Sequence, residues 1–317
     1  MSSNPFKYSA GAVKRIDLSR LDEDTAKYNW ITKPWLGRDA MTLLIGEGGS
    51  CKSLLALDLA IAIAAGRRWL GHEVEKGGVL YLDEDGQEGE TKRRLKALCA
   101  ARGLDPASLQ GSLYVNAPSG LQIESGDTFA DVKDAALSVN ATLIVVDALV
   151  AMHSRDENSS NQMKAVMRSG LRPLMRHTGA GMLIVHHAGK PSDDNRGTNR
   201  ARGSTEIINS TDAALFLSQR KTGPRLEMIR SRVLARTLWP ATLKIEVAGT
   251  EKISILAKVS TTVDTVTNLI ESKGLLSANL TQRQILDSLH EWGCQCSLGT
   301  VNKAMKVLGK IPDDQDG

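Results

Sequence analysis

The chain has 317 residues, 41% of them hydrophobic and 24% charged, which fits one large α/β domain with a substantial core and a small second unit. Its net charge of +4 gives no general argument for nucleic-acid binding, and its four cysteines form no disulfide framework. The N-terminus lacks the apolar core of a signal peptide, and the longest apolar run, residues 54–65, is too short to span a bilayer, so we expect a cytoplasmic protein without a membrane partner.

Residues 1–29 are polar and of mixed charge, and we predict that they form an N-terminal arm. The segment 17–27 within it is either a weak helix or an arm that packs on a neighbouring subunit. Trp30 and Trp35 lead into the first buried strand, and we predict that they pack in the core rather than stack on bases.

The segment 41–65 indicates a short apolar strand, a glycine-rich turn with the sequence GEGGSCKS, and a long apolar helix. The turn matches the phosphate-binding P-loop pattern G-x-x-x-x-G-K-[ST], except that Cys51 stands where the second glycine is expected. We expect Lys52 to reach the β- and γ-phosphates of a nucleotide and the Ser53 hydroxyl to bind Mg²⁺. The predicted nucleotide-binding residues are Gly46, Gly48, Gly49, Ser50, Cys51, Lys52 and Ser53.

Two features of this turn have alternative interpretations. Cys51 is either a tolerated small residue or a reactive thiol, whose pKa the helix N-terminus and the adjacent lysine would lower. The turn as a whole could be an ordinary strand-to-helix connection with Lys52 exposed. The buried strand and the apolar helix on either side of it argue against that alternative.

A second buried strand, predicted over residues 77–82, ends in the acidic cluster Asp83, Glu84 and Asp85. Carboxylates just beyond the carboxyl end of a strand lie where open α/β sheets bind ligands. Such a group can polarise the water that attacks a γ-phosphate; the alternative is a solvated acidic loop. A basic amphipathic helix over 90–102 and a short strand over 113–115 follow.

After a helix predicted over 128–140, the continuous apolar run 141–147 ends in Asp147. This is the form of a Walker B strand, whose terminal carboxylate helps to hold Mg²⁺ beside the P-loop. We therefore predict Ser53 and Asp147 as the metal ligands.

A helix predicted over 163–178 is followed by a buried strand that ends in His186 and His187. A polar residue at this strand end can contact a γ-phosphate and respond to its hydrolysis. The alternatives are a structural histidine and a metal site, and the sequence shows no further ligands at a suitable spacing for the latter.

The polar loop 189–203 contains Arg196, Arg200 and Arg202 and is a candidate nucleic-acid-binding loop, with a plain surface loop as the alternative. A short helix over 204–212 and strands over 213–217, 225–232 and 239–247 are predicted next.

Arg230 and Arg232 lie two residues apart in a predicted strand, so they project to the same face. Two guanidinium groups on one face suit the phosphates of a neighbouring molecule. A solvated strand edge is the alternative.

Residues 265–317 differ in composition and are predicted to form a small helical module. Thr281 and Ser297 are predicted N-caps of two helices joined by a short turn, similar to a helix-turn-helix or winged-helix unit. The exposed part of the second helix, with Thr300, Asn302, Lys303 and Lys306, could bind DNA or a protein. The group His290, Cys294 and Cys296 is too irregularly spaced for a zinc site.

The order of these motifs resembles the RecA-fold ATPases, in particular the DnaB-like hexameric replicative helicases of the plasmid RepA type. The resemblance covers residues 30–247 and depends on GEGGSCKS, VLYLDED, LIVVDAL, LIVHHAGK, RARGST and IRSR. It implies a RecA-like P-loop NTPase core over 30–260, built as a mostly parallel sheet with flanking helices. It also implies Mg²⁺-dependent ATP hydrolysis at the subunit interfaces of a homohexameric ring, coupled to movement on single-stranded DNA.

The resemblance implies a role for each matching residue. Lys52 and Ser53 match the P-loop lysine and Mg²⁺ ligand, Asp147 the Walker B aspartate, and His187 the γ-phosphate sensor. Arg232 looks like the arginine finger that reaches the adjacent subunit, with Arg230 as its basic companion.

The catalytic glutamate of the family falls on Asp85 in a gapless match, with Glu84 one residue earlier. Either Glu84 takes the role through a one-residue shift, or Asp85 performs it less well, because a small misplacement of a catalytic group can cost about 100-fold in rate.

The resemblance is to proteins of plasmids, phages or integrated elements, with a replication initiator or a primase as further partners. Two other functions fit the same residues. One is a recombination or loading ATPase that does not unwind DNA. The other is a regulatory DNA-binding protein whose P-loop only binds nucleotide.

Overall fold

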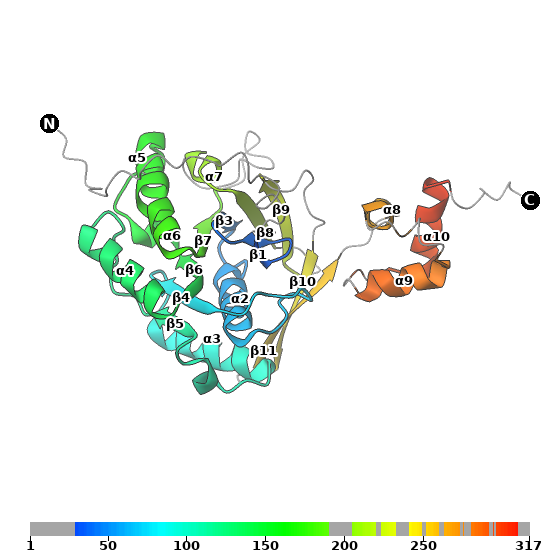
Figure 1. Cartoon of the computed structure of the whole chain (residues 1–317), viewed down its shortest axis with the longest axis horizontal. Helices are drawn as coiled ribbons and strands as arrows, with labels where there is room; N and C mark the ends of the chain where they lie inside the picture. The colour runs from blue at the N-terminus through cyan, green and yellow to red at the C-terminus, as the bar shows by residue number, and fades with distance from the viewer. Residues whose placement is uncertain are drawn as a thin grey trace, which may run out of the picture.

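The computed structural model describes residues 29–189, 205–219, 223–232, 241–248, 252–259, 263–272, 275, 280–291, 294 and 296–309. Most of the predicted N-terminal arm lies outside these residues, and so do Arg196, Arg200 and Arg202 of the predicted nucleic-acid loop. Figure 1 shows a central sheet with helices on both faces and a separate group of C-terminal helices, coloured orange to red.

Nine of the described strands form one sheet in the order β11-β10-β9-β8-β3-β7-β6-β4-β5. The six strands from β8 to β5 are parallel, and β9, β10 and β11 extend one edge in antiparallel fashion. The predicted α/β fold with a mostly parallel sheet is confirmed. The bounds are β3 Met41–Gly46, β4 Gly78–Asp83, β5 Leu113–Asn116, β6 Ala141–Asp147, β7 Gly181–His187, β8 Ala213–Ser218, β9 Arg225–Ser231, β10 Ala241–Ala248 and β11 Lys252–Val259.

The central strands are continuous apolar runs because both faces of the sheet are covered. Successive residues of a strand point to opposite faces: Leu44 packs with α2 and α3 on one side, and Leu43 packs with α4 and α6 on the other. The helices are α2 Lys52–Ala65, α3 Glu88–Ala101, α4 Gly126–Ser138, α5 Ser160–Lys164, α6 Arg172–Thr178 and α7 Glu206–Asn209.

Three short features differ from the sequence-based expectations. The helix predicted over 163–178 is interrupted by a π-helical segment, Ala165–Leu171, between α5 and α6. Strand β11 was not predicted; it pairs with β10 along its whole length and contacts α3. A two-stranded sheet of β1 (Trp30–Thr32) and β2 (Leu36–Gly37) precedes the P-loop strand.

A buried ion pair anchors α2 to the end of α3. Arg102 donates from Nε and Nη2 to the two carboxylate oxygens of Asp58, at 2.8 and 2.7 Å. Asp58 is 2% exposed, and burial raises the pKa of its carboxyl while the hydrogen bonds from Arg102 oppose that change. The pair therefore compensates for a charge placed inside the apolar face of α2.

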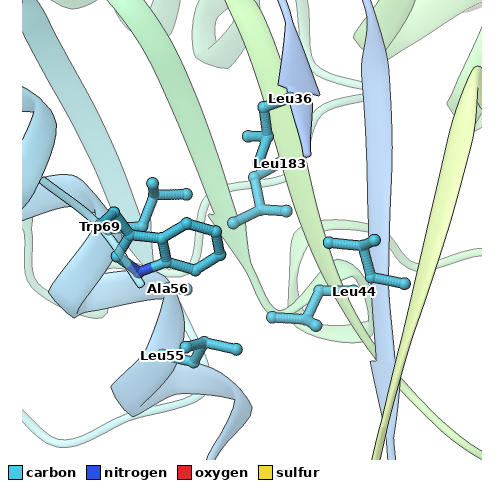
Figure 2. Close-up of a pocket in the computed structure, with 8 residues that line it drawn as sticks. Leu36, Leu44, Leu55, Ala56, Trp69 and Leu183 are labelled. Carbon is cyan, nitrogen blue, oxygen red and sulfur yellow. The ribbon is translucent and has the colours of Figure 1, made fainter. Parts of the chain in front are cut away.

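The apolar layer between α2 and the sheet is closely packed. Trp35 is buried against Trp69 with its ring edge-on at 6.3 Å, so the prediction that Trp35 is a packing residue is confirmed. A cavity of about 10 Å³ remains nearby, lined only by apolar residues that include Leu44, Leu55 and Ala56 (Figure 2). It has room for little more than one water molecule, so this cavity is not a nucleotide site.

The C-terminal helices α8 (Val263–Ser272), α9 (Gln282–Glu291) and α10 (Leu298–Val307) pack around an apolar cluster of their own. The two predicted N-caps are confirmed. Thr281 Oγ1 accepts from Gln284 N at 3.3 Å, and Ser297 Oγ accepts from Thr300 N at 3.1 Å. Among the described residues, no helix combines the length and apolar character that a membrane crossing requires.

Candidate active site

Four adjacent parallel strands bring most of the predicted site residues to one end of the sheet, where these strands have their carboxyl ends. β3, β7, β6 and β4 are neighbours, so their carboxyl ends meet there. Gly46 at the end of β3 is paired with His187, and Asp83 at the end of β4 is paired with Asp147. The P-loop, Asp147 and the two histidines of β7 therefore lie at this end of the sheet.

The P-loop backbone explains which of its positions require glycine. A Cβ atom on Gly46 would lie 2.5 Å from the carbonyl oxygen of Leu217, so no larger residue fits without a shift. Gly49 and Cys51 both have left-handed backbone angles, with φ of 73° and 68°. The left-handed angle accounts for the glycine that the motif normally has at the position of Cys51. A non-glycine residue there costs roughly 1–2 kcal/mol.

We expect the substitution Cys51→Gly to stabilise the protein by about 1 kcal/mol, because glycine adopts this backbone angle without a steric penalty, although it raises the entropy of the unfolded chain. The midpoint of urea-induced unfolding measures the effect. Cys51→Ala is the matched control, since it removes the thiol but keeps the strained angle. A midpoint for Cys51→Gly at or below that of Cys51→Ala would contradict the assigned strain.

The Cys51 thiol has the environment of a structural residue. Burial raises its pKa, and the charges of Arg94 and Lys52 reduce that change without reversing it. Of the two interpretations of Cys51, the structure favours the tolerated small residue over the reactive thiol. Arg94 of α3 is a cation close to the P-loop that the sequence pattern did not single out.

Lys52 lies inside the loop rather than in solvent. Its side-chain Nζ donates to the carbonyl oxygens of Gly46 and Glu47, both at 2.9 Å, and the residue is 6% exposed. Burial lowers the pKa of the ammonium group, while the carboxylates of Asp147 and Asp85 oppose the shift. The alternative of an exposed lysine on an ordinary turn does not describe this geometry.

Ser53 and Asp147 form the predicted pair of oxygen ligands. The Ser53 hydroxyl donates to Asp147 Oδ1 at 3.2 Å. Asp147 is 2% exposed, and burial raises its pKa to about 6, opposed by hydrogen bonds from Tyr81 and Ser53. A hydroxyl and one carboxylate suit Mg²⁺, which usually takes one or two carboxylates together with water and substrate phosphates.

The described residues contain no group of three or more His, Cys, Asp or Glu side chains placed to hold a metal ion. The oxygen pair at Ser53 and Asp147 fits a metal that arrives with a nucleotide. It does not form an all-protein metal cage.

Tyr81 is a site residue that sequence reasoning missed. Its hydroxyl donates to Asp147 Oδ2 at 2.5 Å, and the same oxygen lies 3.3 Å from the carbonyl oxygen of Ser53. Burial and the neighbouring carboxylate raise its pKa well above the usual value, so it stays protonated and holds Asp147 in place. The available signal was a single phenol in an otherwise apolar strand beside the Walker B strand.

The three acidic residues after β4 have three different environments. Asp83 accepts from the backbone N–H of Gly86 at 3.0 Å and from the hydroxyl of Thr91, so it fixes the turn into α3. Asp85 is half exposed, and its Oδ2 lies 3.4 Å from Nε2 of His187. Of the three side chains, that of Asp85 is therefore the one that contacts the side chain of another predicted site residue.

Glu84 turns towards the loop that follows β5. Its carboxylate accepts hydrogen bonds from Asn116 Nδ2 at 2.9 Å, from Ser119 N at 3.1 Å and from Gly120 N at 2.8 Å. With this many donors, the carboxylate holds the loop after β5 in place and does not face the P-loop.

Arg230 and Arg232 lie at the opposite end of the sheet, beside the amino end of β8. Arg232 follows β9, whose last residue pairs with Ala213 at the start of β8, whereas Gly46 pairs with Leu217 four residues further along β8. At about 3.3 Å per residue, that separation exceeds about 13 Å along the strand. Neither arginine can reach the P-loop of its own chain.

The two arginines contact the same short segment, as expected for side chains on one face. Arg230 donates from Nη1 to the carbonyl oxygen of Ile208, and Arg232 donates from Nη2 to that of Asn209 at 2.7 Å. Burial and the nearby charge of Arg232 lower the pKa of Arg230.

A family model described as an AAA domain matches residues 7–193. Among solved structures, the KaiC-like protein PH0186 from the hyperthermophilic archaeon Pyrococcus horikoshii OT3 is similar with a TM-score of 0.51 and 12% identity, over 71% of this chain and 93% of that one. The RadB recombinase gives a TM-score of 0.49 and 18% identity, over 69% of this chain and 91% of that one. At 12% identity, the likeness to the KaiC-like structure shows a shared fold.

Proposed function

The chain belongs to the AAA domain family, and from this premise we propose that it is a Mg²⁺-dependent ATPase. Its core is a RecA-like P-loop NTPase fold, with the P-loop after a central parallel strand. The finer proposal is a hexameric DNA helicase of the DnaB-like, plasmid RepA type, from a plasmid, phage or integrated element. It would couple ATP hydrolysis to movement on single-stranded DNA and work with an initiator or primase.

The observation that most supports ATP hydrolysis is the pair formed by Ser53 and Asp147. The hydroxyl and the buried carboxylate are 3.2 Å apart, beside the inward-facing ammonium group of Lys52. Lys52 would bind the β- and γ-phosphates together with the backbone N–H groups at the start of α2. Ser53 and Asp147 would hold Mg²⁺, which neutralises charge on the phosphates when bound.

Asp85 and His187 are the side chains best placed for the chemical step. We assign Asp85 to orient the attacking water and to accept its proton, because it faces the P-loop edge while Glu84 is bound to a loop. His187, at the end of the strand next to β3, would contact the γ-phosphate. The contact between the two side chains, 3.4 Å from His187 Nε2 to Asp85 Oδ2, would help to hold them in a fixed relative position.

This assignment predicts different outcomes for two adjacent carboxylates. Asp85→Asn should lower kcat by about 100-fold and leave KM for ATP nearly unchanged, because a base acts in the transition state. Glu84→Gln, the same change of charge one residue away, should stay within a few-fold of the wild type, since the amide oxygen still accepts from the loop. Steady-state ATPase kinetics measure both. A larger loss for Glu84→Gln would transfer the role to Glu84.

The arginines support a ring or another assembly of several subunits. Arg232 is exposed at the end of the sheet away from its own P-loop, so a nucleotide that it contacts would be one bound to a neighbouring subunit. We assign Arg232 as the arginine finger and Arg230 as its companion, which makes the active site a composite of two chains. The C-terminal helices would add a contact with DNA or with a protein partner.

The first test is ATP hydrolysis with and without single-stranded DNA, with the Lys52→Ala variant as the blank. Turnover that rises with DNA and disappears in the variant supports the motor, and unwinding of a forked duplex then separates a helicase from a recombination or loading ATPase. Nucleotide binding without turnover above the blank would overturn the proposal and leave the regulatory DNA-binding protein.

A further inference from the structure

Asp212, the residue before β8, connects Arg232 with β3, the strand that leads into the P-loop. Its Oδ2 accepts from the backbone N–H of Met41 at 2.9 Å, and its Oδ1 accepts from Arg232 Nη1 at 3.1 Å. The main chain repeats both connections: Asp212 N donates to the carbonyl oxygen of Met41, and Arg232 N donates to that of Asp212, each at 2.8 Å. Met41 is the first residue of β3, the strand that leads into the P-loop.

The carboxylate of Asp212 is mostly buried and is matched by more than one cation. Its side chain is 18% exposed, and Arg172 of α6 lies 3.4 Å from Oδ2. Arg172 also donates to the carbonyl oxygen of Ser210 at 2.6 Å, so it is held in place by the segment before Asp212. Two guanidinium groups, those of Arg172 and Arg232, thus face one carboxylate, and the excess positive charge suits an anionic ligand at this end of the sheet.

Arg232 is fixed on one side and accessible on the other. One Nη donates to Asp212 and the second donates to Asn209, while the side chain remains 46% exposed. A guanidinium group has five N–H donors in a rigid plane. Two contacts can therefore fix its direction and leave donors for a phosphate of another molecule.

We propose that Asp212 is the positioning residue for Arg232: it holds the guanidinium group in the orientation needed to reach the nucleotide bound to the adjacent subunit. The inference rests on the proposed function, because it requires a nucleotide site shared between two chains. Asp212 itself touches no substrate. Its effect is on the geometry of Arg232, and a misplacement of about 1 Å in a group that binds the transition state can cost about 100-fold in rate.

The substitution Asp212→Asn tests the role with little change in shape. An amide has one acceptor oxygen, so it cannot accept from both Met41 and Arg232 in this geometry. We expect kcat for ATP to fall by 10- to 100-fold with KM changed by less than about twofold, because the lost interaction acts in the transition state. The matched control is Glu206→Gln, which removes an equally buried acid that pairs with Arg168 at 2.9 Å.

Mixed assemblies distinguish positioning from a general structural effect. Asp212→Asn subunits have an intact P-loop, and Lys52→Ala subunits have an intact Arg232 and Asp212. Mixing the impaired protein with the inactive one should therefore raise turnover above that of Asp212→Asn alone. Restored turnover, with unfolding midpoints of the variants near the wild type, supports the proposal. No restoration on mixing, or a defect equal to that of Glu206→Gln, would overturn it.

The same assay separates failure of this inference from failure of the proposed function. If Arg232→Ala abolishes turnover and is restored by Lys52→Ala subunits while Asp212→Asn is fully active, the shared site stands and the role of Asp212 is wrong. If Arg232→Ala itself leaves turnover unchanged, the shared nucleotide site is wrong and the role of Asp212 falls with it.

Discussion

Replacement of Arg232 by alanine is expected to lower the rate of ATP hydrolysis about 1000-fold, the lower end of the range for arginine fingers. The side chain lies at the sheet edge opposite its own P-loop, so the loss should appear at the active site of the neighbouring subunit. Nucleotide affinity should change little, because the P-loop that binds ATP is intact. Steady-state turnover and equilibrium binding of a fluorescent ATP analogue measure the two quantities separately.

Two controls define the Arg232 result. Arg176→Ala removes an exposed arginine from the last turn of α6 and should leave turnover unchanged. Titration of Arg232→Ala with Lys52→Ala subunits should raise turnover to a maximum at intermediate ratios, since each protein supplies what the other lacks. Full turnover by Arg232→Ala alone would show that the arginine does not act on the nucleotide.

The second large effect is on stability. Arg102→Ala is expected to lower the free energy of unfolding by about 3 kcal/mol, because breaking a buried ion pair typically costs 3–5 kcal/mol when one charge is left without its partner. Asp58 is 2% exposed in the middle of α2, so it would have to stay charged in an apolar layer or take up a proton. Urea unfolding followed by circular dichroism gives the free energy.

Two further variants test the cause of the Arg102 effect. Arg93 lies on the exposed face of α3 and pairs with Glu90 at 2.7 Å. The free energy of unfolding of Arg93→Ala should stay within about 0.5 kcal/mol of the wild-type value, because surface ion pairs contribute little. Adding Asp58→Ala to Arg102→Ala should recover most of the lost stability, since no buried charge remains. A double variant as unstable as Arg102→Ala would assign the loss to packing of the arginine stem.

The local patterns that the sequence shows clearly are those with one physical cause. Apolar runs that end in a polar residue predicted β4, β6 and β7, because strands buried on both faces admit few polar side chains before their carboxyl ends. The spacing of Lys52 and Ser53 after the glycines follows from how a loop and a helix start surround an anion. These features need no knowledge of the rest of the chain.

The elements of the C-terminal part of the chain, from β11 to α10, were harder to predict. The capping residues Thr281 and Ser297 identified α9 and α10, because caps depend on contacts within four residues. Helix α8 and strand β11 have no comparable local signal. Their places depend on packing against α10 and pairing with β10, respectively.

The sequence by itself thus determined the fold class and the residue types at the carboxyl ends of the parallel strands. Both follow from hydrophobic periodicity and the P-loop spacing, which are local properties of the chain. The tertiary structure decided which acidic residue faces the P-loop. The Glu84 carboxylate accepts hydrogen bonds from a loop 32 or more residues away in the chain, whereas Asp85 contacts His187. It also brought Tyr81 into contact with Asp147 and placed Arg232 at the end of the sheet away from the P-loop. These choices depend on strand order and register, which are set by contacts between distant segments.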